Sequence, residues 1–93
     1  MSAAEGRATI RNEQGLHFRP MGKLVQLAQT FPCDIRVAYE ETVGDVKVPT
    51  DLIQLAAPFG AELTIRAEGE RAEEAVNAIV ELIHNRFGMT ARD

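Results

Sequence analysis

Apolar residues recur along this chain at two spacings, and each spacing predicts a different backbone conformation. In four segments apolar and polar residues alternate, which is typical of strands with one face toward a core and one toward water. These segments are Arg7–Arg11, Ile35–Tyr39, Val46–Val48 and Leu63–Ala67. A turn over Glu40–Gly44 would make the third strand the hairpin partner of the second.

In three other segments apolar residues recur three or four positions apart, as on one face of a helix. The first predicted helix runs from Phe18 to about Thr30, and the second is a short helix beyond Pro49 that includes Leu55. The third is a long helix that ends near Gly88, and its apolar face runs from Ala72 to Ile83. Either Val48 or Thr50 is expected to cap the short helix.

The element order βαββαβα predicts an α+β fold, in which helices cover one face of a mostly antiparallel sheet. The other face of the sheet is expected to be solvated. The polar residues expected on it are Arg7, Thr9, Arg11, Arg36, Lys47, Thr64 and Arg66.

Length and composition bound the number of domains. Ninety-three residues, of which 45% are hydrophobic and 26% charged, suffice for one core of sheet and helix and are too few for two. We therefore expect a single domain over residues 1–93 with an ordered core of about residues 6–88. The terminal segments Met1–Glu5 and Met89–Asp93 lack periodicity and are expected to fray.

Charge and cysteine content narrow the partners and the compartment. A formal net charge of −4 disfavours nucleic acid and membrane surfaces and favours a protein or a small anion. No apolar window is long enough to span a membrane. The single Cys33 and the absence of an amino-terminal leader predict a reducing, cytoplasmic setting, with Cys33 as a packing residue.

The segment Gly15–Pro20 combines features of an anion site. Pro20 is compatible with the first turn of a helix, so His17 is expected at or beside the cap, with the backbone N–H groups of Phe18 and Arg19 directed at an anion. A neutral imidazole is nucleophilic near neutral pH and can accept a phosphoryl group. The Arg19 guanidinium would then clamp the phosphate, and Gly15 indicates a close approach of backbone.

The alternative for His17 is an ordinary solvated histidine, which is the simplest interpretation of His84 near the end of the last predicted helix. The sequence contains no motif of paired carboxylates, no metal-ligand cluster and no glycine-rich nucleotide loop. We therefore expect no metal, no cofactor and no hydrolase activity.

With Gly15–Pro20 placed before an amphipathic helix, the chain resembles HPr, the histidine-containing phosphocarrier family of the bacterial phosphotransferase system. The resemblance runs from about Arg7 to Ile83 and includes Leu24–Gln26, Lys47, Gly60–Glu62 and Ala67–Glu70. It implies an open-faced β-sandwich of four antiparallel strands with three helices on one face. It also implies that His17 takes a phosphoenolpyruvate-derived phosphoryl group on Nδ1 from phosphorylated enzyme I and passes it to a sugar-specific enzyme IIA.

A carrier of this kind needs an exposed phosphohistidine and an apolar docking patch beside it. The residues expected in that patch are Phe18, Met21, Pro49, Leu52 and Ile53. Met21 is also in phase with the core stripe of its helix, so a purely structural role is the alternative for it. We expect the chain to act as a monomer.

Three departures from the family pattern concern its partners. Val48 stands where many relatives carry a regulatory serine, so phosphorylation by an HPr kinase is expected to be absent, and Thr50 is a poor substitute because Pro49 precedes it. Gln26, Gln29 and Asp51 replace lysines of some relatives. Gly22 lies inside a helix, where glycine is unfavourable. These differences leave open a regulatory adaptor of a nitrogen-type or orphan branch, or a domain of a larger fusion protein.

Overall fold

The computed structural model describes residues 2–90 and Arg92, and the predicted order βαββαβα is confirmed. A short 3-10 turn, η1, follows the last helix. The elements are β1 (Ala3–Thr9), α1 (Phe18–Ala28), β2 (Asp34–Tyr39), β3 (Thr42–Asp45), α2 (Pro49–Leu55), β4 (Glu62–Glu68), α3 (Ala72–His84) and η1 (Arg86–Gly88).

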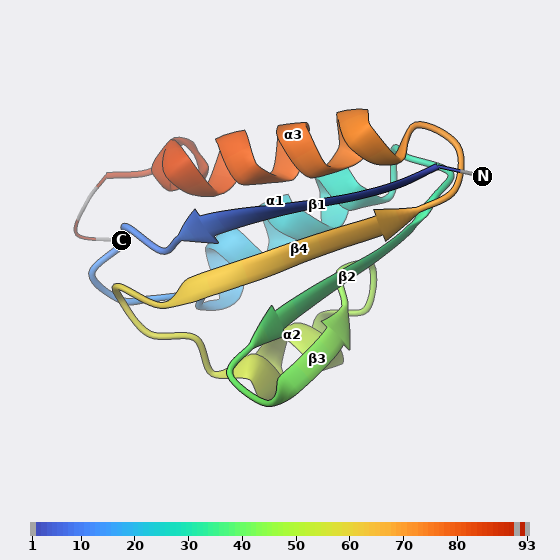
Figure 1. Cartoon of the computed structure of the whole chain (residues 1–93). Coiled ribbons are helices and arrows are strands. Elements are labelled where there is room, and N and C mark those ends of the chain that lie inside the picture. Colours follow the sequence, from blue (N-terminus) through green and yellow to red (C-terminus); the bar gives the residue numbers. More distant parts are fainter. Residues whose placement is uncertain (1, 91, 93) are drawn as a thin grey trace.

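The four strands form one antiparallel sheet in the order β1-β4-β2-β3. In register, Ile65 of β4 lies opposite Gly6 of β1 on one side and opposite Val37 of β2 on the other. Figure 1 shows α1 and α2 behind the sheet and α3 running along β1. The open-faced sandwich is therefore confirmed, with all three helices on one face.

The core lies between the helices and the inner face of the sheet, as the alternation of β4 illustrates. Leu63, Ile65 and Ala67 are buried, whereas Glu62 and Arg66 are exposed. From the helical side, Leu24 of α1, Leu52 of α2 and Ile79 of α3 are fully buried against the sheet. Burial of these apolar side chains is the main favourable term for folding.

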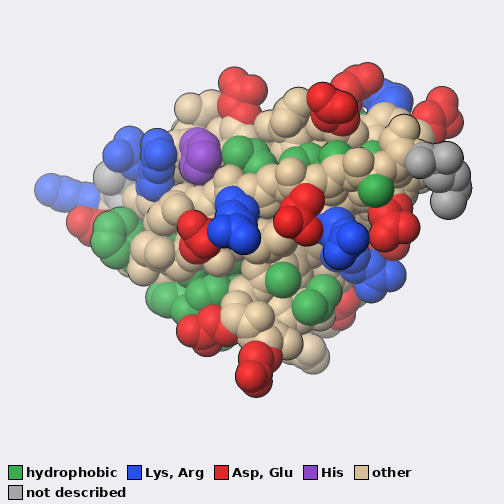
Figure 2. Space-filling view, viewed as in Figure 1, with side chains coloured by type: hydrophobic (Ala, Val, Ile, Leu, Met, Phe, Trp, Pro, Cys, Tyr) green, Lys and Arg blue, Asp and Glu red, His purple; other side chains and the backbone are tan. Residues whose placement is uncertain are grey.

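The outer face of the sheet carries many charged residues, and Figure 2 shows acidic and basic side chains interspersed over the strands, with some hydrophobic side chains among them. Arg7, Arg36 and Arg66 are exposed there as predicted. Two residues were placed on this face wrongly. Arg11 lies beyond the end of β1, where its guanidinium donates to the carbonyl of His84, and Lys47 lies in the turn after β3.

Lys47 is half-buried because its ammonium is used inside the structure. Its Nζ donates to the carbonyl oxygens of Phe31 at 2.7 Å and Cys33 at 2.8 Å, which ties the turn after β3 to the segment after α1. The same turn is held by the Asp45 carboxylate, which accepts a bond from the Lys47 amide at 2.8 Å. Lys47 is therefore a structural cation.

Two strand boundaries also differ from the sequence pattern. Strand β1 begins at Ala3, because Ala3–Glu5 pair with β4, so the prediction that this segment frays is wrong. Strand β3 is Thr42–Asp45 rather than Val46–Val48, because the hairpin turn needs only two residues, Glu40 and Glu41. At the carboxyl end, Met89 is partly buried against the core. Met1, Ala91 and Asp93 of the terminal segments lie outside the described residues.

Candidate functional site

His17 is the N-cap residue of α1, as the sequence predicts. Its backbone is extended, with φ −102° and ψ −171°, and its carbonyl accepts the first helical bond, from the Met21 amide at 3.0 Å. The imidazole makes no capping bond to the helix and is partly exposed. A side chain held at this position stands where an anion at the helix terminus would bind.

The loop before His17 is fixed by contact with the segment after α2. Gly15 has φ +70°, and a Cβ on it would lie 2.5 Å from the Ala57 carbonyl oxygen. That same oxygen accepts a bond from the Leu16 amide at 2.9 Å, and the Leu16 side chain is buried. The close backbone approach expected at Gly15 is confirmed, and only glycine fits it without strain.

The first turn of α1 combines the positive end of a helix dipole with the basic side chain of Arg19. Helix α1 has 11 residues and none of those in its first turn is acidic. The N–H groups of Phe18 and Arg19 lie in that turn, where the intrahelical ladder does not use the amides. Arg19 and Lys23 are exposed on the same helix. This arrangement favours an anion beside His17.

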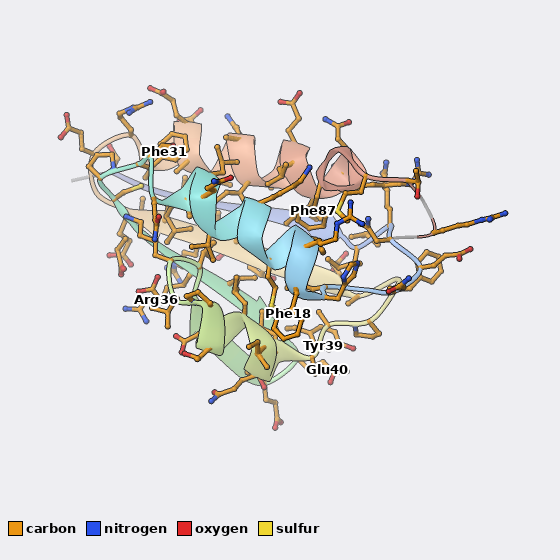
Figure 3. All side chains as sticks on the ribbon, turned by 180° about the vertical axis from the view of Figure 1, so that it is seen from behind. Phe18, Phe31, Arg36, Tyr39, Glu40 and Phe87 are labelled. Carbon is orange, nitrogen blue, oxygen red and sulfur yellow. The ribbon has the colours of Figure 1, made fainter. Side chains whose placement is uncertain are left out.

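An apolar groove of about 480 Å³ runs between α1 and α2, and its lining begins at Phe18, the residue after His17. Phe18 and Ile53 are exposed in it, by 79% and 46%, and Pro49 is also part of the lining. Figure 3 shows Phe18 between the start of α1 and α2. Met21 also lines the groove although it is largely buried, so it contributes to both core and groove.

Leu52 does not belong to this surface. Its side chain is 0% exposed, so the expectation that it contacts a partner is wrong. Helix α2 packs one side against the core. Leu52 and Leu55 form this buried side, and Ile53 faces outward. The lining is completed by Arg19 and by Gly22, Gln26 and Gln29, three positions where the chain departs from the family pattern. Lys23 and Val25 also line the groove, and the sequence reasoning did not assign them to docking.

Val48 caps α2, with Pro49 at the first helical position, as one of the two alternatives predicted. It makes no side-chain capping bond and is exposed.

Among the described residues, no group of three or more His, Cys, Asp or Glu side chains could hold a metal ion. None of the helices described is both long enough and apolar enough to span a membrane.

Sequence reasoning also missed a buried polar residue near the site. Asn12, at the start of the loop that leads to His17, is fully buried and its Nδ2 donates to the Arg86 carbonyl at 3.2 Å. Polar residues in loops are ordinarily exposed, so only the structure reveals this contact across 74 positions of sequence.

Together, the fold and the site define a small α+β protein that presents a helix-capping histidine beside an apolar groove. A sequence model described as "PTS HPr component phosphorylation site" matches residues 4–85. The chain is 45% identical over 80 residues to phosphocarrier protein HPr of Pseudomonas aeruginosa, covering 85% of this chain and 89% of that protein. It is 38% identical over 80 residues to the HPr of Cupriavidus necator, covering 86% and 90%.

Solved structures agree. The HPr-C-His crystal structure from Thermoanaerobacter tengcongensis superposes with a TM-score of 0.89 at 33% identity, over 94% of this chain and 98% of that one. The chain therefore belongs to the HPr phosphocarrier family of the phosphotransferase system. A longer relative is the phosphoryl donor subunit DhaM of a PEP-dependent dihydroxyacetone kinase from Providencia stuartii, 32% identical over 79 residues that make up 17% of it.

Proposed function

We propose that His17 accepts a phosphoryl group from phosphorylated enzyme I and passes it to enzyme IIA components. The observation that carries this proposal is the position of the imidazole at the N-cap of an 11-residue helix, in a chain of the HPr family. A solvated histidine with no anion site around it would serve neither transfer.

The proposed chemistry uses the lone pair of a neutral ring nitrogen, which the family resemblance assigns to Nδ1. As that nitrogen forms its bond to phosphorus, the bond from phosphorus to the donor atom of enzyme I breaks. The transferred group carries negative charge, which the amides of the first turn of α1 and the Arg19 guanidinium would stabilise. The second transfer reverses these roles, with His17 as the leaving group.

A carrier must release phosphate as readily as it accepts it, which requires an open site. The partly exposed His17 beside the groove fits this requirement, because one surface can serve each partner in turn. Phe18, Pro49 and Ile53 are the proposed docking residues, with Met21 at the edge of the core. Since His17 and the groove lie on the same chain, we propose that a cytoplasmic monomer carries out both transfers.

The regulatory branch that uses a serine at the start of α2 is proposed to be absent. Val48 occupies that position and has no hydroxyl group to phosphorylate. Thr50 follows Pro49 inside the helix and has a different backbone setting from the N-cap.

The experiment is a two-stage transfer assay with phosphoenolpyruvate and enzyme I, followed by enzyme IIA. The wild-type chain is expected to take up label and lose it to enzyme IIA, whereas His17→Ala takes up none. His84→Ala, which removes the other histidine, is the matched control and is expected to behave as wild type. Labelling of His17→Ala would contradict the acceptor role, and a label that no enzyme IIA discharges would favour a regulatory adaptor.

A further inference from the structure

The buried side chain of Asn12 connects the loop before His17 to the turn η1. We propose that Asn12, Arg86 and Phe87, together called the C-terminal clasp, position this loop for phosphoryl transfer, with Asn12 as the positioning residue. The effect on transfer rests on the proposed role of His17, whereas the effect on the loop itself does not.

A chain of three hydrogen bonds leads from the clasp to the backbone of His17. Asn12 Nδ2 donates to the Arg86 carbonyl at 3.2 Å. The carbonyl of Asn12 accepts from the Gly15 amide at 2.9 Å, and the carbonyl of Gly15 accepts from the His17 amide at 3.2 Å. A second contact joins the same two segments, from Gln14 Nε2 to the Arg92 carbonyl at 3.2 Å. The position of the loop is thus coupled to that of η1.

The backbone of η1 is strained, and a single side chain anchors it. Arg86, Phe87 and Gly88 have φ values of 56°, 56° and 72°, so two residues with a Cβ adopt the left-handed conformation in succession. Such conformations persist only where the surroundings impose them. Phe87 supplies that constraint, because its ring is 1% exposed and lies between the C-terminal end of α3 and helix α1 (Figure 3).

Asn12 does not have the bonding expected of a residue selected for stability alone. Its side chain is 0% exposed, yet Oδ1 accepts no hydrogen bond from the described residues. A half-satisfied buried amide costs stability that an apolar residue of similar size would avoid. Local rules of this kind are broken mainly at functional sites. We infer that an asparagine occupies this buried position because its side-chain amide bonds to the Arg86 carbonyl.

The clasp is separate from the docking groove. Residues of η1 pack against α1 and α3, whereas the groove lies between α1 and α2.

The first test is amide hydrogen exchange in Asn12→Ala, with Phe87→Ala as a second variant that removes the other part of the clasp. Both are expected to speed exchange at the Gly15 and His17 amides by about tenfold, because loss of the tether opens the loop locally. Exchange within β4 should change far less. Ile35→Val, a buried change in β2 away from the loop, is the control for a general loss of stability.

The second test measures phosphoryl uptake from enzyme I. Asn12→Ala is expected to lower kcat about tenfold with a KM for enzyme I within about twofold of wild type, since the loop is misplaced and the groove is intact. Unchanged loop exchange, or equal effects in Ile35→Val, would overturn the clasp. If the wild-type chain takes up no phosphate, the proposed function fails, and the exchange data still decide the clasp.

Discussion

Gly15 and Ala57 approach so closely that a Cβ on Gly15 would stand 2.5 Å from the Ala57 carbonyl oxygen. The two residues belong to different loops, one leading into α1 and the other leaving α2. Their contact therefore fixes the N-terminus of α1 relative to the helix across the groove. The position of His17 depends on a glycine two residues earlier.

Replacing Gly15 by alanine tests this contact. Gly15→Ala is expected to lower the free energy of unfolding by about 2–4 kcal/mol, because the left-handed conformation and the clash both add cost. Urea denaturation measures the change. Gly60→Ala is the matched control, since Gly60 has φ +84° but nothing within 4 Å of a new Cβ, and should cost only about 1 kcal/mol. Equal losses in the two variants would show that the approach to Ala57 is unimportant.

Lys47 provides a second stability test. Lys47→Met keeps the length of the side chain and removes the two hydrogen bonds to the carbonyls of Phe31 and Cys33. We expect a loss of about 2 kcal/mol, because hydrogen bonds to a charged donor are worth more than neutral ones. Thermal unfolding measures it, with Lys23→Met on the exposed surface of α1 as the control. A Lys47→Met protein as stable as the control would mean that the turn after β3 holds without this cation.

The Arg19 guanidinium is expected to act on transfer rather than on folding. Arg19→Ala should slow phosphoryl uptake by about tenfold or more, because it removes a charge-assisted contact to the phosphate, while the free energy of unfolding changes by less than about 0.5 kcal/mol. Arg36→Ala on the outer face of the sheet serves as the control for charge alone. Equal rates for Arg19→Ala and wild type would contradict the proposed contact between the Arg19 guanidinium and the phosphate.

At Gly22, in contrast, replacement by alanine is expected to stabilise the protein. It lies inside α1, and nothing is found within 4 Å of a Cβ built on it. Gly22→Ala should therefore raise the free energy of unfolding by about 0.5–1 kcal/mol. In Gly44→Ala the new Cβ would meet the Asp51 Cβ at 2.9 Å, so that variant should be less stable than wild type. If both variants shift the denaturation midpoint in the same direction, the different surroundings of Gly22 and Gly44 do not determine the effect of an added Cβ.

Periodicity predicted the helices well, because each buries one stripe against the sheet. Met21, Leu24 and Ala28 are buried in α1 as their spacing requires, and His17 caps the helix because Pro20 limits where the helix can begin. The shortest strand was misplaced. Val46 is apolar and buried although it lies in a turn, so its pattern with Val48 imitates a strand.

Contacts between segments that are far apart in the sequence could not be predicted from the hydrophobic pattern. Ala3–Glu5 show no clear alternation, and only pairing with β4 makes them a strand. Lys47 is unremarkable until its two carbonyl partners are seen, and the burial of Asn12 depends on a turn more than 70 residues away. For the site, local sequence indicated His17, Arg19 and Phe18, whereas the burial of Leu52 followed from how α2 is rotated on the core.

In the proposed function, a ring nitrogen of His17 carries the phosphoryl group. Nitrogen and phosphorus NMR of the chain labelled with ¹⁵N-histidine, before and after incubation with phosphoenolpyruvate and enzyme I, can detect that bond. We expect the Nδ1 resonance of His17 to shift and to couple to phosphorus, while both nitrogens of His84 stay unchanged. A phosphorus signal with no coupling to His17, or coupling to His84 instead, would exclude His17 as the carrier.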